Sequence, residues 1–239
     1  MVILTIDIGN TRAKLVVLAD GEVVDHRVAP HDALVATLRN LLAAHPQTER
    51  IHWCSVGPDL PALSEFFAAC PLPVRRLFPT APPAGVQVAY ATPQTLGADR
   101  LAAVLGARAL RPAADLLVID AGTCITYDLL TAGGVYLGGN ISPGLDMRLR
   151  ALAEQTARLP HVAAAGPTPL MGDSTETAIR SGVVRGIAYE IDGYVRTLAA
   201  QYPNLCVFLT GGNRFDFPIS PEIRTFADDY LVARGLSVL

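Results

Sequence analysis

Apolar runs separated by polar turns fill the first thirty residues. Residues 2–8 form a β-branched run that ends in the turn Asp7-Ile8-Gly9-Asn10-Thr11, and residues 13–18 form a second run directly after it. Asp20-Gly21 then precedes a run at residues 22–28 in which apolar and polar residues alternate. Such runs, bounded by Gly with Asn or Asp, are typical of strands joined by hairpins. The pattern predicts three antiparallel strands.

The spacing of apolar residues then changes to that of a helix. Leu34, Leu38 and Leu41 share one side of a predicted helix over residues 32–44, and Asp32 is suited to its N-cap. The other elements predicted in the first half are strands at residues 51–56 and 74–78, a helix over about 60–69 between them, and an exposed proline-rich loop at 79–85.

The strand-and-turn pattern starts again near the middle of the chain. An apolar strand at residues 116–119 runs into Asp120-Ala121-Gly122-Thr123, a second strand follows at 124–130, and Gly133-Gly134 forms the next turn. Asp7 and Asp120 are 113 residues apart, close to half the chain, and each opens a turn that carries Gly and Thr. This spacing indicates two related lobes rather than a solenoid, with chance similarity of short segments as the alternative.

Two helices and a buried strand are predicted in the remainder. Ser142-Pro143 is a suitable N-cap and first turn for a helix that ends near Arg158, and residues 160–169 form a loop. A long helix over residues 175–201 has apolar residues every four positions, and residues 205–209 form a buried strand before Gly211-Gly212-Asn213. The long helix contains three glycines, for which close packing against another backbone, such as a second subunit, is one explanation: Gly182, Gly186 and Gly193.

Composition excludes several classes of protein. The 239 residues are 51% hydrophobic with a mean hydropathy of +0.34, which excludes a disordered chain. A net charge of −3 without long charged runs argues against binding to nucleic acid or to anionic membranes and favours a small-molecule partner. The N-terminus lacks a basic leader, and no apolar run approaches the roughly 18 residues of a membrane span. These features predict a cytoplasmic protein.

The three glycine-containing turns are candidates for contact with a phosphate chain. Small residues let backbone N–H groups approach anionic oxygens, and hydroxyl groups add donors. The carboxylates of Asp7 and Asp120 would repel phosphate directly, so a cation or water must lie between them. A single turn of this kind is common in hairpins that bind nothing, and the sequence contains neither a P-loop nor a G-x-G-x-x-G motif. Only the combination points to an ATP site.

These turns resemble the phosphate 1, phosphate 2 and adenosine motifs of the sugar kinase, heat-shock protein 70 and actin superfamily. Within it, the chain closely resembles type III pantothenate kinase, because further signatures follow in order. They are Tyr90-x-x-Pro93-x-x-Leu96-Gly97-Ala98-Asp99-Arg100, the turn Gly138-Gly139-Asn140-Ile141-Ser142-Pro143-Gly144, and Gly172-Asp173-Ser174-Thr175. The resemblance implies an α/β fold of two duplicated ribonuclease H-like (actin-like ATPase) lobes. Each lobe would be a mixed five-stranded sheet flanked by helices, over residues 1–115 and 116–239, with ATP in the cleft between them.

The resemblance also implies a reaction, in which the γ-phosphoryl group of ATP moves to the primary hydroxyl of pantothenate in the first step of coenzyme A synthesis. Asp99 would be the catalytic base. Its place just inside a predicted helix start favours its ionised form, whereas the plainer interpretation is a first-turn carboxylate that only favours the helix dipole. The other implied pantothenate contacts are Tyr90, Gly97, Ala98, Arg100 and Thr175, the last supplied across a homodimer interface.

The implied ATP site includes the whole first turn and the strand after it: Asp7, Ile8, Gly9, Asn10, Thr11, Arg12, Ala13 and Lys14, together with Thr123. Asp7 would approach Mg²⁺ through water, and Asp120 would bind a monovalent cation, K⁺ or NH₄⁺. Lys14 has a plainer interpretation as a strand residue that points to solvent. Cys124, next to Thr123, is expected to be a small packing residue whose thiol modification would inhibit.

Three alternatives share this fold. One is an ATP-binding regulatory or accessory protein, the second is a polymerising actin-like ATPase, and the third is a kinase for another small hydroxylated metabolite. A chain of 239 residues leaves little room for the inserted subdomains of polymerising relatives. Asp99 and Arg100 argue against a purely regulatory protein, and the segment from Tyr90 to Arg100 argues against another substrate. The fold alone does not separate these alternatives.

Overall fold

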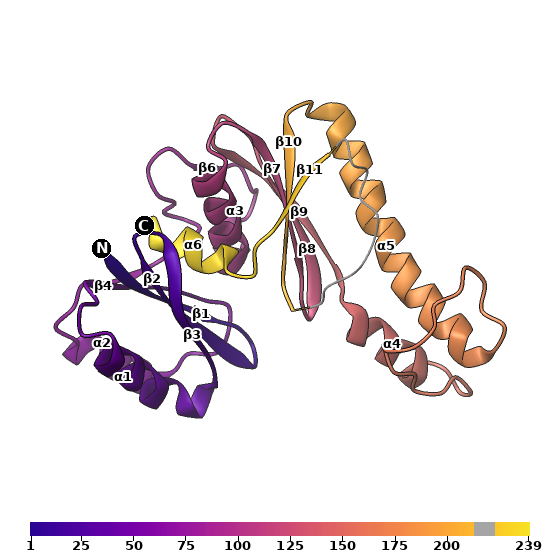
Figure 1. Ribbon diagram of the computed structural model, residues 1–239, viewed down its shortest axis with the longest axis horizontal. Coiled ribbons are helices and arrows are strands. Elements are labelled where there is room, and N and C mark those ends of the chain that lie inside the picture. Colours follow the sequence, from indigo (N-terminus) through magenta and orange to yellow (C-terminus); the bar gives the residue numbers. More distant parts are fainter. Residues whose placement is uncertain (213–222) are drawn as a thin grey trace. The chain divides into compact units, whose positions relative to one another are not determined.

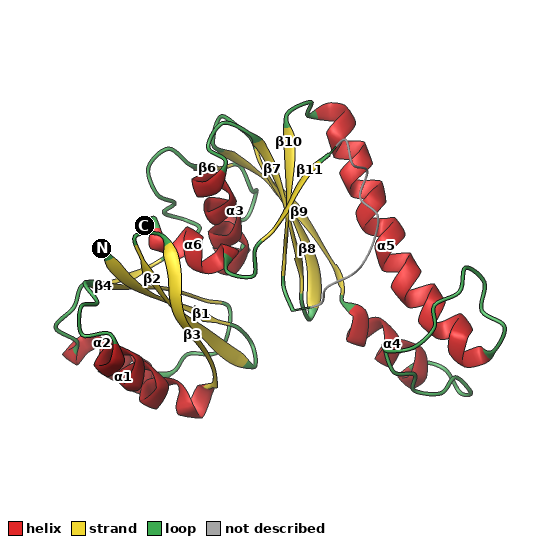
Figure 2. Ribbon diagram, in the orientation of Figure 1, coloured by secondary structure: helices red, strands yellow, loops and turns green. Residues whose placement is uncertain are grey.

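The computed structural model describes residues 1–212 and 223–239, which form two β-sheets flanked by helices (Figures 1 and 2). The first sheet has five strands in the order β3-β2-β1-β4-β5. The second has six, in the order β11-β10-β7-β8-β9-β6, because the two-residue strand β6 pairs with the outer side of β9. The predicted α/β fold class is confirmed, with one strand more than expected in the second sheet.

The elements of the first half are β1 (Val2–Ile8), β2 (Arg12–Ala19), β3 (Glu22–Pro30), α1 (Leu34–Ala44), β4 (Arg50–Ser55), α2 (Pro61–Ala69), β5 (Val74–Arg76), β6 (Gln87–Val88) and α3 (Ala98–Leu110). Those of the second half are β7 (Asp115–Ala121), β8 (Cys124–Leu130), β9 (Val135–Pro143), α4 (Leu145–Glu154), α5 (Thr175–Gln201), β10 (Leu205–Thr210), β11 (Arg224–Ala227) and α6 (Leu231–Ser237). The 3₁₀-helices η1 (His31–Ala33) and η2 (Pro93–Thr95) precede α1 and α3.

The three predicted N-terminal strands are confirmed as an antiparallel meander. Strand β1 pairs with β2 from Val2↔Ala19 to Ile8↔Ala13, and β2 pairs with β3. The turn between β2 and β3 consists of Asp20 and Gly21, both with positive φ, as a two-residue hairpin turn requires. Strand β4 then lies parallel to the other edge of β1, which places β1 in the middle of the sheet.

Each face of the first sheet is covered by different helices. Leu4, Ile6 and Ile8 of β1 point toward α1 and α2 and form the larger core cluster with leucines of those helices. The alternate residues point to the opposite face, where Val16 and Leu18 of β2 pack against α6. Because side chains alternate along a strand, Asp7 belongs to this second face. Figure 1 shows α1 and α2 side by side on one face and α6 on the other.

Helices α3 and α6 pack so closely that their backbones touch. A Cβ atom added at Gly106 of α3 would lie 2.0 Å from the carbonyl oxygen of Leu231, and one added at Gly235 of α6 would lie 1.7 Å from that of Ala102. His52 of β4, which is buried, bonds through Nδ1 to the carbonyl oxygen of Leu236 at 2.7 Å. The C-terminal helix is therefore fixed against both α3 and β4.

The second sheet repeats the plan of the first. Strands β1 and β7 are both seven residues long with the same order of buried and half-buried positions, and Asp7 and Asp120 both stand next to last. A parallel strand follows each in space, β4 beside β1 and β10 beside β7. The order β9-β8-β7-β10-β11 matches β3-β2-β1-β4-β5. This correspondence supports an internal duplication over chance similarity.

Two predicted helix starts are wrong. Asp32 does not cap α1, because it lies exposed within η1, and this 3₁₀ turn leads directly into α1 with Ala33 at the N-cap. Ser142 and Pro143 end β9, and α4 begins at Leu145 with Gly144 as its N-cap. Arg148 bonds the hydroxyl of Ser142 and the carbonyl of Pro143, so these groups hold an arginine instead of capping. Helix α4 also ends at Glu154, before the predicted Arg158.

The close contacts divide the chain into two units. The first contains Met1–Ala114, Leu129–Gly138 and Tyr230–Leu239, and the second contains Asp115–Asp128 and Gly139–Asp229. The predicted domain boundary between residues 115 and 116 stays a prediction. Among the described residues, no helix is both long enough and apolar enough to cross a membrane.

Candidate functional site

In the first unit, the turn after β1 exposes the residues predicted to meet ATP. The N–H group of Gly9 donates to the carbonyl oxygen of Arg12 at 3.0 Å, which closes the turn and leaves Asn10 and Thr11 exposed at its tip. On β2 the side chains of Arg12 and Lys14 are also exposed. Ile8 and Ala13, in contrast, belong to the core cluster, so these two could meet a nucleotide only through their backbone.

A second glycine supports this turn and was missed from the sequence. Val56 and Gly57 follow β4, and their N–H groups donate to the carbonyl oxygen of Ile8 at 2.9 and 3.2 Å. A Cβ atom at Gly57 would lie 2.4 Å from the carbonyl oxygen of Gly9, so only glycine fits there. His31 contacts the same oxygen of Gly9 through Nε2 at 3.0 Å. The signal in the sequence was a glycine soon after a predicted buried strand.

Asp7 and Asp99 lie near one buried thiol. Cys54 is the register partner of Asp7 on β4, and its Sγ donates to Asp7 Oδ1 at 3.6 Å. Burial raises the pKa of the Cys54 thiol well above its ordinary value, and the negative charges of Asp7 and Asp99 raise it further. Both carboxylates are half-buried. Asp7, the predicted metal-side aspartate, thus contacts Cys54, and Asp99, the predicted base, lies within electrostatic range of the same thiol.

The start of helix α3 positions Asp99. Gly97 is the N-cap, and Asp99 is the second residue of a 13-residue helix, as the sequence predicted. Asp99 Oδ1 accepts a hydrogen bond from the N–H group of Arg100 at 2.8 Å. A Cβ atom at Gly97 would lie 2.5 Å from the same oxygen, so Gly97 leaves room for this carboxylate. Ala98 and Arg100 are buried beside it.

Tyr90 packs onto strand β9. Its ring is centred 6.2 Å from that of Tyr136 at a tilt of 56°, and an added Cβ at Gly138 would lie 3.3 Å from its Cδ2 atom. The ring is half-buried. The predicted pantothenate contact is thus fixed by the glycine-rich segment that the sequence also singled out.

In the second unit, Gly122 and Gly211 border Asp120. The N–H group of Gly122 donates to the carbonyl oxygen of Cys124 at 2.9 Å. Gly211 has a φ of +101°, and an added Cβ there would lie 2.6 Å from Asp120 Oδ1 and 2.5 Å from the carbonyl oxygen of Ala121. Gly211 after β10 is therefore the counterpart of Gly57 after β4. Asn213, the last residue of the predicted adenosine motif, lies outside the described residues.

Thr123 is exposed at the tip of this second turn. Gly144 contacts the backbone of the same turn. The N–H group of Gly144 donates to the carbonyl oxygen of Thr123 at 3.1 Å. Thr175 begins helix α5 and is exposed. Ser174 and Thr177 cap that helix start reciprocally, a capping box that the sequence analysis did not identify.

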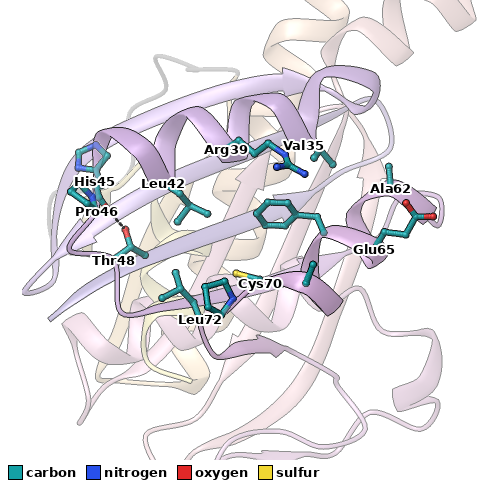
Figure 3. A pocket seen from close by; sticks show the side chains of 13 residues that line it. Val35, Arg39, Leu42, His45, Pro46, Thr48, Ala62, Glu65, Cys70 and Leu72 are labelled. Atoms are coloured by element: carbon teal, nitrogen blue, oxygen red, sulfur yellow. Dashed lines mark hydrogen bonds between the residues drawn. The ribbon is translucent and has the colours of Figure 1, made fainter.

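A pocket of about 600 Å³ lies elsewhere in the first unit, between α1 and α2 (Figure 3). Phe66 is one of its lining residues, and the Arg39 guanidinium lies 5.3 Å from the centre of the Phe66 ring. None of the predicted site residues lines this pocket. Apolar side chains form much of its wall, among them Val35, Leu42, Ala62 and Leu72.

The family model for type III pantothenate kinase matches residues 3–197. A type III pantothenate kinase from Phocaeicola vulgatus is 44% identical over 253 residues, which cover 98% of this chain and 96% of the relative. This chain belongs to the type III pantothenate kinase family. A second member, from Flavobacterium johnsoniae, is 40% identical over 216 residues and covers 88% of this chain and 86% of its own.

Solved structures show the fold of this type III pantothenate kinase family member in more distant proteins. A Campylobacter jejuni protein described as a Baf family transcriptional activator aligns with a TM-score of 0.60 at 21% identity, over 98% of this chain and 96% of that one. A ROK family glucokinase from Streptomyces griseus, in complex with glucose and AMPPNP, aligns with a TM-score of 0.55 at 13% identity, over 99% and 97%. At these identities the likeness shows the fold alone.

Proposed function

We propose that this chain phosphorylates pantothenate to 4′-phosphopantothenate with ATP, the first step of coenzyme A synthesis. Family membership over residues 3–197 supports the reaction class. The observation on the chain itself that supports the proposal is that Asp7 and Asp99 both act on the buried Cys54 thiol, Asp7 through a hydrogen bond and Asp99 through its charge. A kinase that transfers a phosphoryl group to an alcohol needs one acidic group on the metal side of the phosphate chain and one beside the attacking hydroxyl.

Asp99 is the proposed base. The hydroxyl oxygen of pantothenate attacks the γ-phosphorus, the bond from that phosphorus to the β-bridging oxygen breaks, ADP leaves, and the hydroxyl proton passes to Asp99. The N-terminal end of a helix favours the ionised form of a carboxylate, and Asp99 is in the first turn of α3. Positioning accounts for most catalysis in phosphoryl transfer, so the hydrogen bond from the Arg100 N–H group, which orients the carboxylate, supports this role.

ATP is proposed to lie against the exposed tip of the first turn, with Gly9, Asn10 and Thr11 as donors, and against Thr123 in the second unit. Arg12 and Lys14 are exposed cations on the strand after the first turn. The buried Ile8 and Ala13 would contribute backbone groups. A kinase of this family acts on ATP with a divalent metal ion, and we assign Mg²⁺ to Asp7 through water.

A single carboxylate such as that of Asp7 fits a metal ion that arrives bound to the phosphates of the nucleotide. Among the described residues, no group of three or more His, Cys, Asp and Glu side chains could hold a metal ion. Mg²⁺ commonly keeps several waters and takes one or two carboxylates together with substrate phosphates. When bound, the ion neutralises phosphate charge as the γ-phosphoryl group leaves.

Asp120 is the proposed ligand of a monovalent cation, K⁺ or NH₄⁺. The equivalence of Asp120 with Asp7 supports a cation role, and Gly211 leaves space beside its carboxylate where any side chain would collide. The carbonyl oxygen of Ala121 borders the same space, and backbone carbonyl oxygens are the ligands that K⁺ takes in selective protein sites.

The pantothenate site is proposed to include Tyr90, Gly97, Ala98 and Arg100, with Thr175 from a second copy of the chain. The buried guanidinium of Arg100 is placed beside Asp99 and could supply charge-assisted hydrogen bonds. The ring of Tyr90 offers an apolar surface with a polar end.

A cytoplasmic homodimer is the proposed assembly. Three glycines of α5 leave open surface, since added Cβ atoms would meet no described atom within 4 Å: Gly182, Gly186 and Gly193. Glycine destabilises a helix interior by roughly 0.5–1 kcal/mol relative to alanine, so close approach of another backbone is a reason to keep three of them.

The test is ADP release from purified protein with ATP and Mg²⁺, measured with and without pantothenate in K⁺, NH₄⁺ or Na⁺. The proposal predicts pantothenate-dependent turnover, and Asp120→Asn should lower it and weaken its dependence on the monovalent cation. Turnover with other hydroxylated metabolites but not pantothenate would point to another kinase. ATP binding without turnover in any cation would favour the regulatory alternative.

A further inference from the structure

A partly buried hydrogen-bond network in the second unit joins three elements to helix α5. Glu190 of α5 accepts from the Tyr127 hydroxyl of β8 through Oε1 at 2.7 Å and from Arg148 Nη2 of α4 through Oε2 at 2.5 Å. The rings of Tyr127 and Tyr194 of α5 lie 4.3 Å apart, which adds an apolar contact between the same two elements. The charged side chains of Arg148 and Glu190 are 21% and 24% exposed, so water screens this ion pair little.

The charge state of the network is well defined. Burial alone would raise the pKa of Glu190, but hydrogen bonds from Arg148, Tyr127 and Ser142 outweigh it and hold that pKa below its ordinary value. Burial and the Glu190 carboxylate raise the pKa of Tyr127. Glu190 is thus an anion and Tyr127 a neutral donor throughout the physiological range.

Arg148 extends this network to the end of strand β9. Its Nε donates to the carbonyl oxygen of Pro143 at 2.7 Å, and its Nη2 also donates to Ser142 Oγ at 2.7 Å. The backbone N–H group of Arg148 donates to the carbonyl oxygen of Gly144 at 3.0 Å. The side chain of one arginine, itself oriented by Glu190, therefore fixes Ser142 and Pro143, and the first backbone hydrogen bond of α4 fixes Gly144 next to them.

The last of these residues, Gly144, lies against the proposed ATP-binding turn. Gly144 donates its N–H group to the carbonyl oxygen of Thr123. An added Cβ at Gly144 would lie 2.3 Å from that oxygen and 2.5 Å from the carbonyl oxygen of Gly122. Because Gly144 packs this closely against the two carbonyl groups, a displacement of residues 142–144 would also displace the Gly122-Thr123 turn.

We propose that Arg148 and Glu190 are positioning residues for ATP: through residues 142–144 they hold the Gly122-Thr123 turn in the geometry that receives the nucleotide phosphates. Neither residue contacts the nucleotide. The inference rests on the proposed function, because it assumes that Thr123 meets ATP. It adds that the affinity for ATP depends on an ion pair to helix α5, the helix whose first residue is the predicted substrate contact Thr175.

The test compares Glu190→Gln with the wild type in two measurements, the Kd of a non-hydrolysable ATP analogue and the KM values for ATP and pantothenate. Glutamine keeps the shape of the side chain and removes the charge that orients Arg148. We expect the Kd of the analogue and the KM for ATP to rise on the order of tenfold, with the KM for pantothenate nearly unchanged. Arg148→Met should have the same effect, and Arg148→Lys, which keeps one charged donor, should restore part of the affinity.

Val195→Ala is the matched control for a purely structural effect. Val195 is a fully buried apolar residue of the same helix, so its truncation lowers the melting temperature and removes none of the hydrogen bonds of the network. This variant should keep the wild-type Kd for the analogue. The inference is wrong if Glu190→Gln binds the analogue like the wild type, or if Val195→Ala loses as much affinity at an equal fall in melting temperature.

Failure of the proposed function would be recognised separately. A wild-type protein that binds the analogue but shows no pantothenate-dependent turnover would overturn the reaction, and the Kd comparison would still decide the positioning role. A wild-type protein that does not bind the analogue would overturn both.

Discussion

At the scale of single residues, Cys54 links the two acidic groups of the candidate site. Its thiol is buried, donates to Asp7, and feels the charges of both Asp7 and Asp99. Because the thiolate is the reactive form, a raised pKa makes such a cysteine inert even next to a functional site. Cys206 is equally buried, whereas Cys70 and Cys124 are partly exposed.

Thiol labelling of the native protein should follow this division. Iodoacetamide at pH 8 is expected to modify Cys70 and Cys124 and to leave Cys54 and Cys206 unmodified until denaturant is added, as peptide mass spectrometry would measure. Alkylation of Cys54 in the folded protein as fast as that of Cys124 would contradict the environment described here.

Site residues that lie in a local sequence pattern were predictable, and those whose role depends on contacts with distant parts of the chain were not. Asp7 and Asp99 stand in recognisable patterns, a turn after a strand and the first turn of a helix. Gly57 is required because the backbone at Gly9 approaches it closely. Glu190 lies in the middle of helix α5, where nothing in the local sequence distinguishes it from other polar helix residues. Their partners are dozens of residues away, so periodicity alone carries no signal for them.

At the scale of elements, the contact between α3 and α6 demands two glycines. Gly106→Ala should lower the free energy of unfolding by about 3 kcal/mol, because the new methyl group would overlap the Leu231 carbonyl and force the helices apart. Gly133→Ala, where only an ordinary contact would form, should stay within about 0.5 kcal/mol. Urea unfolding of both variants measures the difference, and equal stabilities would contradict the packing of α6 on α3.

The bond between β4 and α6 predicts a pH dependence. Burial lowers the pKa of His52 below 6.5, so the folded protein favours the neutral ring that bonds to Leu236. As the pH falls below 6.5, the unfolded chain binds a proton that the folded one resists, and the free energy of unfolding decreases.

His52→Gln should flatten this dependence between pH 7.5 and 5.5 in urea unfolding, since the amide can still donate and does not titrate. The carboxylates with lowered pKa values, Asp20, Asp25 and Glu190, titrate below this range. An unchanged slope in His52→Gln would exclude His52 as its source.

Elements with a strong periodic pattern of apolar residues have the bounds predicted from the sequence. Elements whose ends depend on tertiary contacts do not. Strand β1 and helix α5 have the predicted limits, since alternation and i, i+4 spacing are local. The predicted start of α4 was wrong because Ser142 and Pro143 accept hydrogen bonds from the Arg148 side chain and do not cap the helix. Strand β6, of two residues, exists only through its pairing with β9.

At the scale of the whole molecule, the repeated sheet order explains why one sequence carries two similar aspartate turns. Each unit contains a strand, a turn and a supporting glycine, so the duplication accounts for two turns of the same construction. The family assignment shows that this design serves a kinase.

The proposed dimer predicts the effect of a bulky residue on α5. Gly186→Leu should convert a dimer to a monomer in light scattering after gel filtration, because leucine would block close approach of a second backbone. Ala200→Leu, an exposed position near the end of the same helix, should stay dimeric. A wild-type monomer, or a Gly186→Leu dimer of unchanged stability, would contradict an interface along these glycines.

The most direct test of the central claim is the mass of the product. Protein incubated with ATP, Mg²⁺ and pantothenate should form phosphopantothenate in equal amount to ADP. Asp99→Asn should form it roughly 10²- to 10⁴-fold more slowly while binding an ATP analogue as the wild type does. Product formation by Asp99→Asn at the wild-type rate would contradict the account, as would wild-type protein that releases ADP without forming phosphopantothenate.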